Sequence, residues 1–332
     1  MNMANAGKGL LSIIIVNRNG REVIKDCLTS IHDTVTTPHE VIMVDNNSSD
    51  GSADFVEREF PDTIVLRQTR NLGFSKGNNV GCERSVGGYI LFLNPDVIVL
   101  RNAVDTMVNY VAVHKEIGIL GPKMLEINGK ISRNGKRRLP TPSQDLLDLF
   151  LLHRIAEIVR AMLSKIGPLG RIFSYQYEKS GRCECISGSC MMLKKADFES
   201  LGGFDETVPM YLDDIDLCFR SLKSGKLNYY LADAAIVHIG QASTRKTKNY
   251  KLYDVLCMRA RMIYYRKNFG KIRQVSYACI LLLSVPYLLL LDLLAAPYYL
   301  FSGNMTDYKL IVKKHLMYVD VVLDRPVERI LE

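Results

Sequence analysis

The chain lacks several patterns that would assign it to a common class. It has no internal repeat and no low-complexity tract, and its 48% hydrophobic and 23% charged residues are typical of a globular protein. The stretch 71–79 matches neither the Walker pattern nor G-x-G-x-x-G, which disfavours a P-loop enzyme and a dinucleotide oxidoreductase. The basic residues are not interleaved with aromatic ones, so we expect no nucleic-acid partner.

Disulfide and zinc frameworks are also missing. Eight cysteines occur without regular spacing in a chain too large to need covalent staples, which favours reduced thiols in the cytoplasm. The stretch Cys183-x-Cys185-x4-Cys190 lacks the C-x2-C spacing of a zinc site and an obvious fourth ligand. Residues 1–9 contain no apolar run, so we expect no signal peptide.

Length and net charge set only broad limits. The 332 residues can form one large domain with an appendage or two modest domains. The formal net charge of +8 fits an anionic ligand, a membrane surface or nucleic acid equally well, so the charge alone does not choose between them.

The chain opens with alternating buried strands and amphipathic helices. Residues 10–16 form a continuous apolar run, a helical stripe covers 23–31, and a second apolar run covers 40–44. Strand, helix and strand in this order predict an α/β layer with a mostly parallel sheet flanked by helices. Because ligands bind outside the carboxyl ends of such strands, we expect Asn17 and Asp45 to lie side by side at a ligand edge.

Two further strands lead into polar segments. The strand predicted at 63–66 precedes stretch 71–79, where two glycines and a lysine would let backbone amides approach a phosphate or a base. The strand predicted at 89–93 is stopped by a proline, which leaves Asp96 at the same sheet edge as Asp45. A carboxylate there suits a hard cation that bridges phosphates, although an ordinary turn aspartate would show the same pattern.

Three carboxylates occur where a loop is predicted to run into a helix. Asp213 can cap the apolar-periodic run that begins at Ile215, and acids suit the positive end of a helix dipole. Asp213, Asp214 and Asp216 therefore indicate either a well-capped surface helix or a functional acidic group.

Six short motifs, in order along the chain, carry a family resemblance. They are Val16-Asn17-Arg18-Asn19, Asp45-Asn46-Asn47-Ser48-Ser49-Asp50-Gly51-Ser52, Asn71-Leu72-Gly73-Phe74, Leu93-Asn94-Pro95-Asp96, Gly202-Gly203-Phe204-Asp205-Glu206 and Asp213-Asp214-Ile215-Asp216-Leu217. Together they resemble the inverting family 2 glycosyltransferases of the GT-A fold, most closely the rhamnosyltransferase-like and galactofuranosyltransferase-like members. The resemblance covers roughly residues 11–243.

The resemblance implies a role for each motif residue. Asp45 would hold the pyrimidine or ribose of a nucleotide sugar, and Asp214 would be the general base that deprotonates the acceptor hydroxyl. Asp213 and Asp216, on the acceptor side, would orient the acceptor or raise the pKa of Asp214. The residues expected on the nucleotide side are Asn17, Asp45, Asn71, Asn79 and Asn94.

The expected metal site departs from the family pattern. The family motif is D-x-D, but Asn94 replaces its first acid here, so Asp96 needs a further protein ligand. His238 ends an apolar run and lies 24 positions after Asp214 (238 − 214), where related enzymes carry a metal-binding histidine. A histidine at a strand end is more often structural, but the other motifs favour Mg²⁺ or Mn²⁺ bound by Asp96 and His238.

Basic and apolar segments follow. Four of the six residues 133–138 are basic, and an amphipathic helical run is predicted at 143–166. This insertion, 133–180, would lie in a membrane interface or pack on the sheet. Segment 276–301 carries one charge, Asp292, and is long enough to cross a bilayer at about 1.5 Å per residue.

The apolar segment is nevertheless expected not to span. Pro286 and Pro297 interrupt it, and basic residues flank both of its sides. We expect a helical hairpin or an interfacial platform on the cytoplasmic face of the inner membrane, with a buried homo-oligomer interface as the alternative. A closing amphipathic helix is predicted at 306–332.

The sequence as a whole predicts a GT-A catalytic domain at 10–245 and a C-terminal helical region at 246–332 that associates with a membrane or a second copy. By resemblance, the activity (EC class 2.4) moves a sugar, in the first place rhamnose, from a dTDP or UDP donor. The acceptor would be a hydroxyl of a glycan or lipid-linked glycan in cell-surface polysaccharide synthesis. The alternatives are a nucleotidyltransferase, which should carry a glycine- and basic-rich loop after its first strand, and a non-catalytic nucleotide-sugar-binding protein, which would not need Asp214.

Overall fold

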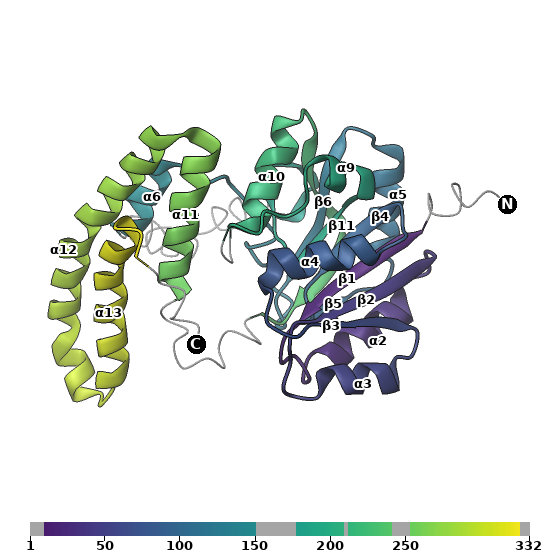
Figure 1. Ribbon diagram of the computed structural model, residues 1–332, viewed down its shortest axis with the longest axis horizontal. Helices are drawn as coiled ribbons and strands as arrows, with labels where there is room; N and C mark the ends of the chain where they lie inside the picture. Colours follow the sequence, from purple (N-terminus) through teal and green to yellow (C-terminus); the bar gives the residue numbers. More distant parts are fainter. Residues whose placement is uncertain (1–9, 151–176, 209–211, 241–252, 326–332) are drawn as a thin grey trace, which may run out of the picture. The chain divides into compact units, whose positions relative to one another are not determined.

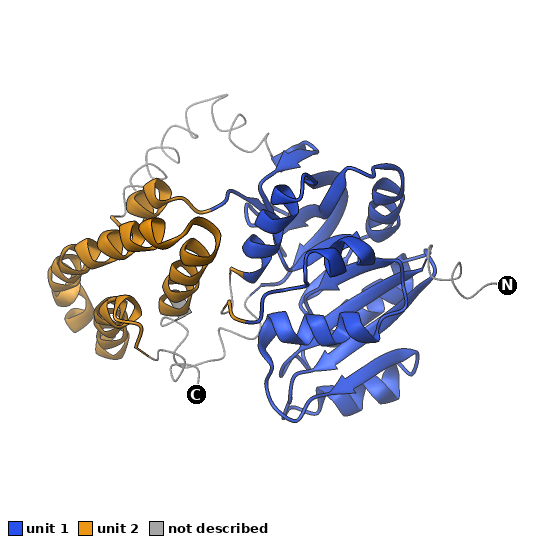
Figure 2. Cartoon of the chain, turned by 45° about the horizontal axis from the view of Figure 1, so that its top comes forward, with its two compact units in different colours: residues 1–139, 174–206, 213–244 blue, residues 140–173, 207–212, 245–332 orange. Residues whose placement is uncertain are grey.

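The computed structural model describes residues 10–150, 177–208, 212–240 and 253–325. The chain divides into two compact units (Figure 2). Residues 1–139, 174–206 and 213–244 form the first, and residues 140–173, 207–212 and 245–332 form the second. This division assigns residues 140–173, which the sequence analysis placed in the catalytic domain, to the second unit.

The first unit alternates strands and helices along the chain (Figure 1). Its strands are β1 (Leu11–Asn17), β2 (His39–Asp45), β3 (Thr63–Arg67), β4 (Tyr89–Leu93), β5 (Val97–Val99), β6 (Ile117–Leu125), β7 (Lys136–Arg137), β8 (Gly181–Cys183), β9 (Cys185–Ile186), β10 (Cys190–Lys194) and β11 (Leu227–His238). Its helices are α2 (Ile24–Thr34), α3 (Ser52–Glu59), α4 (Gly73–Arg84), α5 (Ala103–Val113), α9 (Lys195–Ser200) and α10 (Asp213–Lys223).

Nine of these strands form one sheet. The order is β3-β2-β1-β4-β10-β6-β11-β5, with β8 paired to β11. The pairs among β3, β2, β1 and β4 are parallel, as is the pair of β6 with β11. β10 and β5 run antiparallel to their neighbours. The predicted GT-A-like α/β fold, with a mostly parallel sheet flanked by helices, is confirmed.

Helices pack on both faces of this sheet. Ile13 and Ile15 of β1 join an apolar core with residues of α2, α3 and α5. Ile14, which points to the opposite face, contacts α4. A Cβ at Gly81 would lie 2.4 Å from Ile14 Cγ2, so glycine at this position lets α4 approach the sheet closely. Most of stretch 71–79 is therefore helix packed on strands rather than an open loop of amides.

β7 and β9 form a separate antiparallel ribbon. Lys136 lies opposite Ile186, and Arg137 lies opposite Cys185. The chain then turns through residues 187–189 and enters β10, which pairs with β4. Two of the basic residues in the insertion therefore lie in a strand whose partner leads directly to the central sheet.

The described part of the second unit consists mainly of the helices α6 (Pro142–Leu149), α11 (Tyr253–Phe269), α12 (Lys271–Phe301) and α13 (Met305–Val322). Asp145 of α6 is fully buried and bonds with Arg261 and Tyr265 of α11. These buried bonds explain why α6 groups with the C-terminal helices. The remainder of the helix predicted at 143–166 falls from residue 151 onward outside the described residues.

α12 is one continuous helix of 31 residues, so the prediction that Pro286 and Pro297 interrupt the apolar segment is wrong. α12 packs against α6, α11 and α13. A hairpin forms instead between α12 and α13, where His315 Nδ1 lies 2.6 Å from Asp292 Oδ2. By length and composition α12 could cross a membrane, with a mean hydropathy of 2.3.

Candidate active site

The carboxyl ends of β1 and β2 bring Asn17 and Asp45 together. The two residues are direct partners in the parallel register. Asn17 is fully buried, and its Nδ2 donates to Ser52 Oγ at 2.8 Å. Asp45 Oδ2 accepts from Ser48 N at 3.2 Å, whereas its buried Oδ1 has no hydrogen-bond partner in the part of the chain that the structure describes. An unpaired buried carboxylate oxygen is costly, so this atom suits a donor supplied by a ligand.

Asn46, the residue after β2, organises the adjacent loop. It is 3% exposed, its Oδ1 accepts from Leu72 N at 2.7 Å, and its Nδ2 donates to Gly73 O at 3.0 Å. This clamp fixes the start of α4 beside Asp45. The sequence signals this role only weakly, by an asparagine that directly follows a buried strand.

The two asparagines expected in a base pocket have different surroundings. Asn71 is exposed, and its Oδ1 accepts from Gly73 N at 3.0 Å. Asn79 Nδ2 donates to Phe204 O at 2.9 Å, and its Oδ1 accepts from Phe204 N at 2.9 Å. Both ends of the Asn79 amide thus bind the backbone of Phe204, and its place in a base pocket stays a prediction.

Asp96 and His238 lie together where β5 pairs with β11. His238 is the register partner of Val97, and its Nε2 lies 3.2 Å from Asp96 Oδ1. The Asp96 side chain is 9% exposed and the His238 side chain 23%. Asn94 begins the same turn, and its backbone N donates to Ser189 O at 2.9 Å. The structure thus brings the two expected metal ligands into contact.

A divalent cation fits this pair in combination with a substrate. Within the described ranges, no three His, Cys, Asp or Glu side chains are grouped closely enough to hold a metal. Two protein ligands that include a carboxylate are typical of a cation whose other ligands are phosphate oxygens and waters. The donor set of Asp96 and His238 therefore fits a nucleotide-bound cation and does not fit an all-protein structural site.

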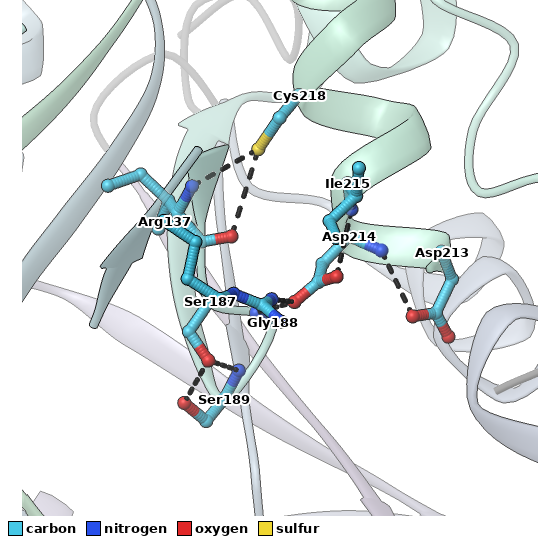
Figure 3. A network of polar contacts seen from close by, with 9 residues as sticks. Arg137, Ser187, Gly188, Ser189, Asp213, Asp214, Ile215 and Cys218 are labelled. Carbon is cyan, nitrogen blue, oxygen red and sulfur yellow. Dashed lines mark hydrogen bonds and ion pairs between the residues drawn. The ribbon is translucent and has the colours of Figure 1, made fainter. Parts of the chain in front are cut away.

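Asp214 lies in the first turn of α10 and receives three donors (Figure 3). Its Oδ1 accepts from Ile215 N at 2.8 Å, and its Oδ2 accepts from Gly188 N at 2.8 Å. Arg137 of β7 forms an ion pair with the same Oδ2. Nothing in the sequence distinguishes Arg137 from its basic neighbours, so this contact between distant segments could not be predicted.

The other two acids of α10 are buried. Asp213, the first helical residue, accepts from Asp214 N at 3.0 Å, and Ser75 Oγ lies 3.4 Å from its Oδ2. Burial and the neighbouring Asp214 charge raise the pKa of Asp213 to about 7. Asp216 is fully buried and pairs with Arg220 at 2.7 Å. Asp216 has no exposed surface, and its expected role on the acceptor side stays a prediction.

Gly188 lies between the first turn of α4 and the acids of α10. A Cβ on Gly188 would lie 3.2 Å from Phe74 Cζ and 3.2 Å from Asp214 Cβ. Phe74 directly follows Gly73, which Asn46 binds. The end of β2 and the start of α10 are thus linked through the first turn of α4 within one compact unit.

The family follows from this fold and these motif positions. Residues 12–202, more than half of the chain, match Glycosyl transferase family 2, and the chain belongs to this family. It is therefore a glycosyltransferase, an enzyme of EC class 2.4, that transfers a sugar in polysaccharide synthesis. The predicted family is confirmed, and the nucleotidyltransferase alternative is set aside.

Several characterised proteins are similar to this chain. The N-acetylglucosaminyl-diphospho-decaprenol L-rhamnosyltransferase of Mycobacterium tuberculosis is 25% identical, over 71% of this chain and 78% of that protein. The rhamnosyltransferase WbbL of Escherichia coli is 23% identical, over 81% of this chain and all of WbbL (100%). The low-salt glycan biosynthesis hexosyltransferase Agl10 of Haloferax volcanii is 27% identical, over 82% of this chain and 81% of that protein.

Solved structures share the fold at low sequence identity. The mannosyltransferase PcManGT from Pyrobaculum calidifontis, in complex with GDP-Man and Mn²⁺, aligns with a TM-score of 0.56 over 96% of this chain and 87% of that one, at 15% identity. GalNAc-T7 with UDP, GalNAc and Mn²⁺ aligns with a TM-score of 0.52 over 70% of this chain and 44% of that one, at 14% identity. These alignments support the fold.

Asp213→Asn is expected to stabilise the protein above pH 7 and to have little effect near pH 4. The pKa of Asp213 is about 7 in the folded chain against an ordinary 3.8, so the folded state binds this proton more tightly than the unfolded chain and loses stability as the pH rises through that window. At pH 8 we expect a gain of more than about 1 kcal/mol in urea unfolding. Asp26→Asn, at an exposed acid on α2, is the control, and an equal pH-dependent gain in both variants would contradict the assignment.

Proposed function

We propose that the chain is a metal-dependent, inverting rhamnosyltransferase that uses a pyrimidine nucleoside diphosphate donor and a glycan or lipid-linked glycan acceptor. The main support is that Asp45, Asp96, His238 and Asp214 belong to one compact unit and lie at strand ends or in direct contact with the turns beside them. Carboxylates and an imidazole in this arrangement match what a nucleotide sugar requires: a polar anchor, a cation site and a base.

The donor would bind beside β1 and β2. The unpartnered Oδ1 of Asp45 would accept a hydrogen bond from a pyrimidine N–H or a ribose hydroxyl, and Asn94 would line the approach to the diphosphate. The rhamnosyltransferases of Mycobacterium tuberculosis and Escherichia coli support rhamnose, with dTDP as the first candidate and UDP as the second. The mycobacterial name also supports an acceptor attached to a lipid diphosphate.

Asp96 and His238 would hold Mg²⁺ or Mn²⁺. When bound, the cation would stabilise the negative charge that develops on the departing diphosphate. The 3.2 Å approach of His238 Nε2 to Asp96 Oδ1 keeps two ligands of the required type on adjoining strand ends. The presence of Mn²⁺ in the mannosyltransferase and GalNAc-T7 structures is consistent with this cofactor.

Asp214 would take the proton of the acceptor hydroxyl as its oxygen attacks the anomeric carbon. The bond to the acceptor forms while the bond to the diphosphate breaks on the opposite face, so a single displacement inverts the configuration without a covalent sugar intermediate. The Gly188 and Ile215 amides orient the carboxylate. Asp213, with a pKa of about 7, can keep a proton beside it, which limits like-charge repulsion.

Asp96→Asn and His238→Ala are expected to remove the metal-dependent part of nucleotide binding. In a thermal-shift panel of UDP, dTDP, GDP and ADP with and without Mn²⁺, the wild type should be stabilised selectively by a pyrimidine diphosphate with metal. Asp233→Asn, at an exposed acid on β11, is the matched control and should retain the full shift. A purine preference, or a shift independent of metal, would overturn the proposed donor and cofactor.

Asp214→Asn is expected to lower the rate of sugar transfer by about 10²–10⁴-fold, the usual contribution of a general base. Nucleotide binding in the presence of Mn²⁺ should persist, because the Asp214 carboxylate does not contact the nucleotide in this scheme. The rate is measured as transfer of radiolabelled rhamnose from dTDP-rhamnose to acceptors in a lipid extract. Unchanged transfer by the variant would rule out Asp214 as the base.

The second unit supports association with the cytoplasmic face of a membrane. Leucines on α12 are well exposed, among them Leu293 at 66% and Leu294 at 69%. A cavity of about 380 Å³ in the same unit is lined by the basic residues Arg259, Arg266 and Lys267 and by the acidic residue Asp324. An exposed apolar helix next to basic groups is typical of proteins that bind anionic membrane surfaces.

Leu293→Glu combined with Leu294→Glu is expected to reduce co-sedimentation with anionic phospholipid vesicles at least tenfold, because two charges would have to enter the apolar phase. Val113→Glu, at an apolar residue of α5 that is 73% exposed, is the control and should sediment like the wild type. If the α12 variant instead keeps vesicle binding and dissociates an oligomer in light scattering, the apolar face is an interface between copies of the chain.

A further inference from the structure

The proposed base receives three protein donors, and two of them share its Oδ2. Asp214 Oδ1 accepts from Ile215 N, and Oδ2 accepts from Gly188 N, both at 2.8 Å, while Arg137 forms an ion pair with Oδ2. A carboxylate that is to accept a proton from a hydroxyl must present a lone pair to it. The two backbone donors are fixed by the chain, so Arg137 is the donor that can leave.

Arg137 and Gly188 reach Asp214 from the same small ribbon. Arg137 lies in β7 opposite Cys185 of β9, and the chain continues from β9 into the turn that carries Gly188. Ser187 N donates to Gly135 O at 3.2 Å, which ties this turn back to the start of β7. The Arg137 backbone is therefore held in place, and only its side chain is free to change partner.

The Arg137 guanidinium retains binding capacity. Its side chain is 34% exposed, against 10% for Asp214. Its buried Nε has no hydrogen-bond partner within the described ranges. A guanidinium carries five N–H donors in a planar fork that matches two oxygens of a phosphate. The neighbouring Asp214 carboxylate raises the pKa of Arg137, so the group remains a cation.

We propose that Arg137 is a binding residue for a phosphate group of a substrate and that, in the empty site, it restrains Asp214. Binding of the phosphate draws the guanidinium from the carboxylate and leaves an oxygen of Asp214 open to the acceptor hydroxyl. The base is thereby unmasked only when a phosphate-bearing substrate is present. The identity of Asp214 as the base rests on the proposed function, whereas the exchange of partners by Arg137 can be tested by binding alone.

The exchange has a thermodynamic consequence. If Arg137 must give up Asp214 in order to bind phosphate, removal of the Asp214 charge should strengthen phosphate binding, and the gain should require Arg137. If Asp214→Asn instead acts only by relieving repulsion between the Asp214 charge and the phosphate, the gain in affinity should not require Arg137. Repulsion is larger when Arg137 is absent, so the gain would then be equal or greater in an Arg137 variant.

Calorimetric titration of pyrophosphate with Mg²⁺ into the wild type, Arg137→Gln, Asp214→Asn and the double variant measures this coupling. We expect Arg137→Gln to weaken binding about tenfold, which corresponds to one charge-assisted contact, and Asp214→Asn to tighten it several-fold. The tightening should disappear in the Arg137→Gln background. Arg138→Gln, at the exposed next residue of the same segment, is the control and should bind like the wild type.

Two further titrations identify which substrate supplies the phosphate. UDP with Mn²⁺ represents the donor, and farnesyl diphosphate, added to protein saturated with UDP and Mn²⁺, represents a lipid diphosphate acceptor. The ligand whose affinity depends on Arg137 and rises in Asp214→Asn is the one that draws the guanidinium away. Arg137→Lys should recover part of the affinity through its charge but not the paired geometry.

The proposal is overturned if Asp214→Asn leaves the affinity for all three ligands unchanged, or if it raises the affinity equally with and without Arg137. Either result would make the ion pair a purely structural one. Because removal of one partner can unfold the chain, circular dichroism accompanies each variant, and the neutral double variant gives the folded reference. If UDP with Mn²⁺ binds while the coupling is absent, the partner exchange fails and the glycosyltransferase function stands.

Discussion

The pairing of β10 with β4 is the constraint on which the site depends. β10 enters the sheet antiparallel to β4 about a hundred residues later in the chain, with Cys190 opposite Leu93. This register brings the turn at 187–189 to the end of β4, where Asn94 N donates to Ser189 O. Gly188 in the same turn binds Asp214. This antiparallel pairing therefore helps to fix the acids of α10 relative to the polar ends of the parallel strands.

The site concentrates negative charge and balances it locally. Asp45, Asp96, Asp213 and Asp214 are each less than a tenth exposed. Backbone amides and Arg137 offset Asp214, His238 adjoins Asp96, and burial beside Asp214 lets Asp213 keep a proton near neutral pH. Buried carboxylates without such partners would be strongly destabilising. Asp45 has one carboxylate oxygen without a hydrogen-bond partner among the described residues, and we propose that a nucleotide supplies that partner.

Much of the catalytic unit could be predicted from the sequence because its strands are short apolar runs that end in polar residues. The runs at 10–16, 40–44 and 89–93 correspond closely to β1, β2 and β4. His238 Nε2 and Asp96 Oδ1, of the proposed metal pair, lie 3.2 Å apart. Local periodicity identifies such strands because both of their faces are buried. The family motifs supplied what periodicity could not, namely which strand ends matter.

Most of the contacts that could not be predicted join distant segments. Arg137 reaches Asp214 across 77 positions and Asn79 reaches Phe204 across 125. Arg137 does not differ in type from its exposed neighbour Arg138. Asp216 shares an acidic motif with Asp214, but its helical position turns it inward toward Arg220. The two prolines of α12 do not end the helix, although a proline removes a backbone hydrogen bond and usually breaks or kinks a helix.

The central claim, that one site in the first unit binds a nucleotide through a cation, is tested most directly by anomalous diffraction from crystals grown with UDP or dTDP and Mn²⁺. The account predicts a single strong Mn²⁺ peak bonded to Asp96 and His238 and to the diphosphate, with the pyrimidine ring of the nucleotide beside Asp45. A Mn²⁺ peak that contacts neither Asp96 nor His238, or a nucleotide bound away from Asp45, would contradict it.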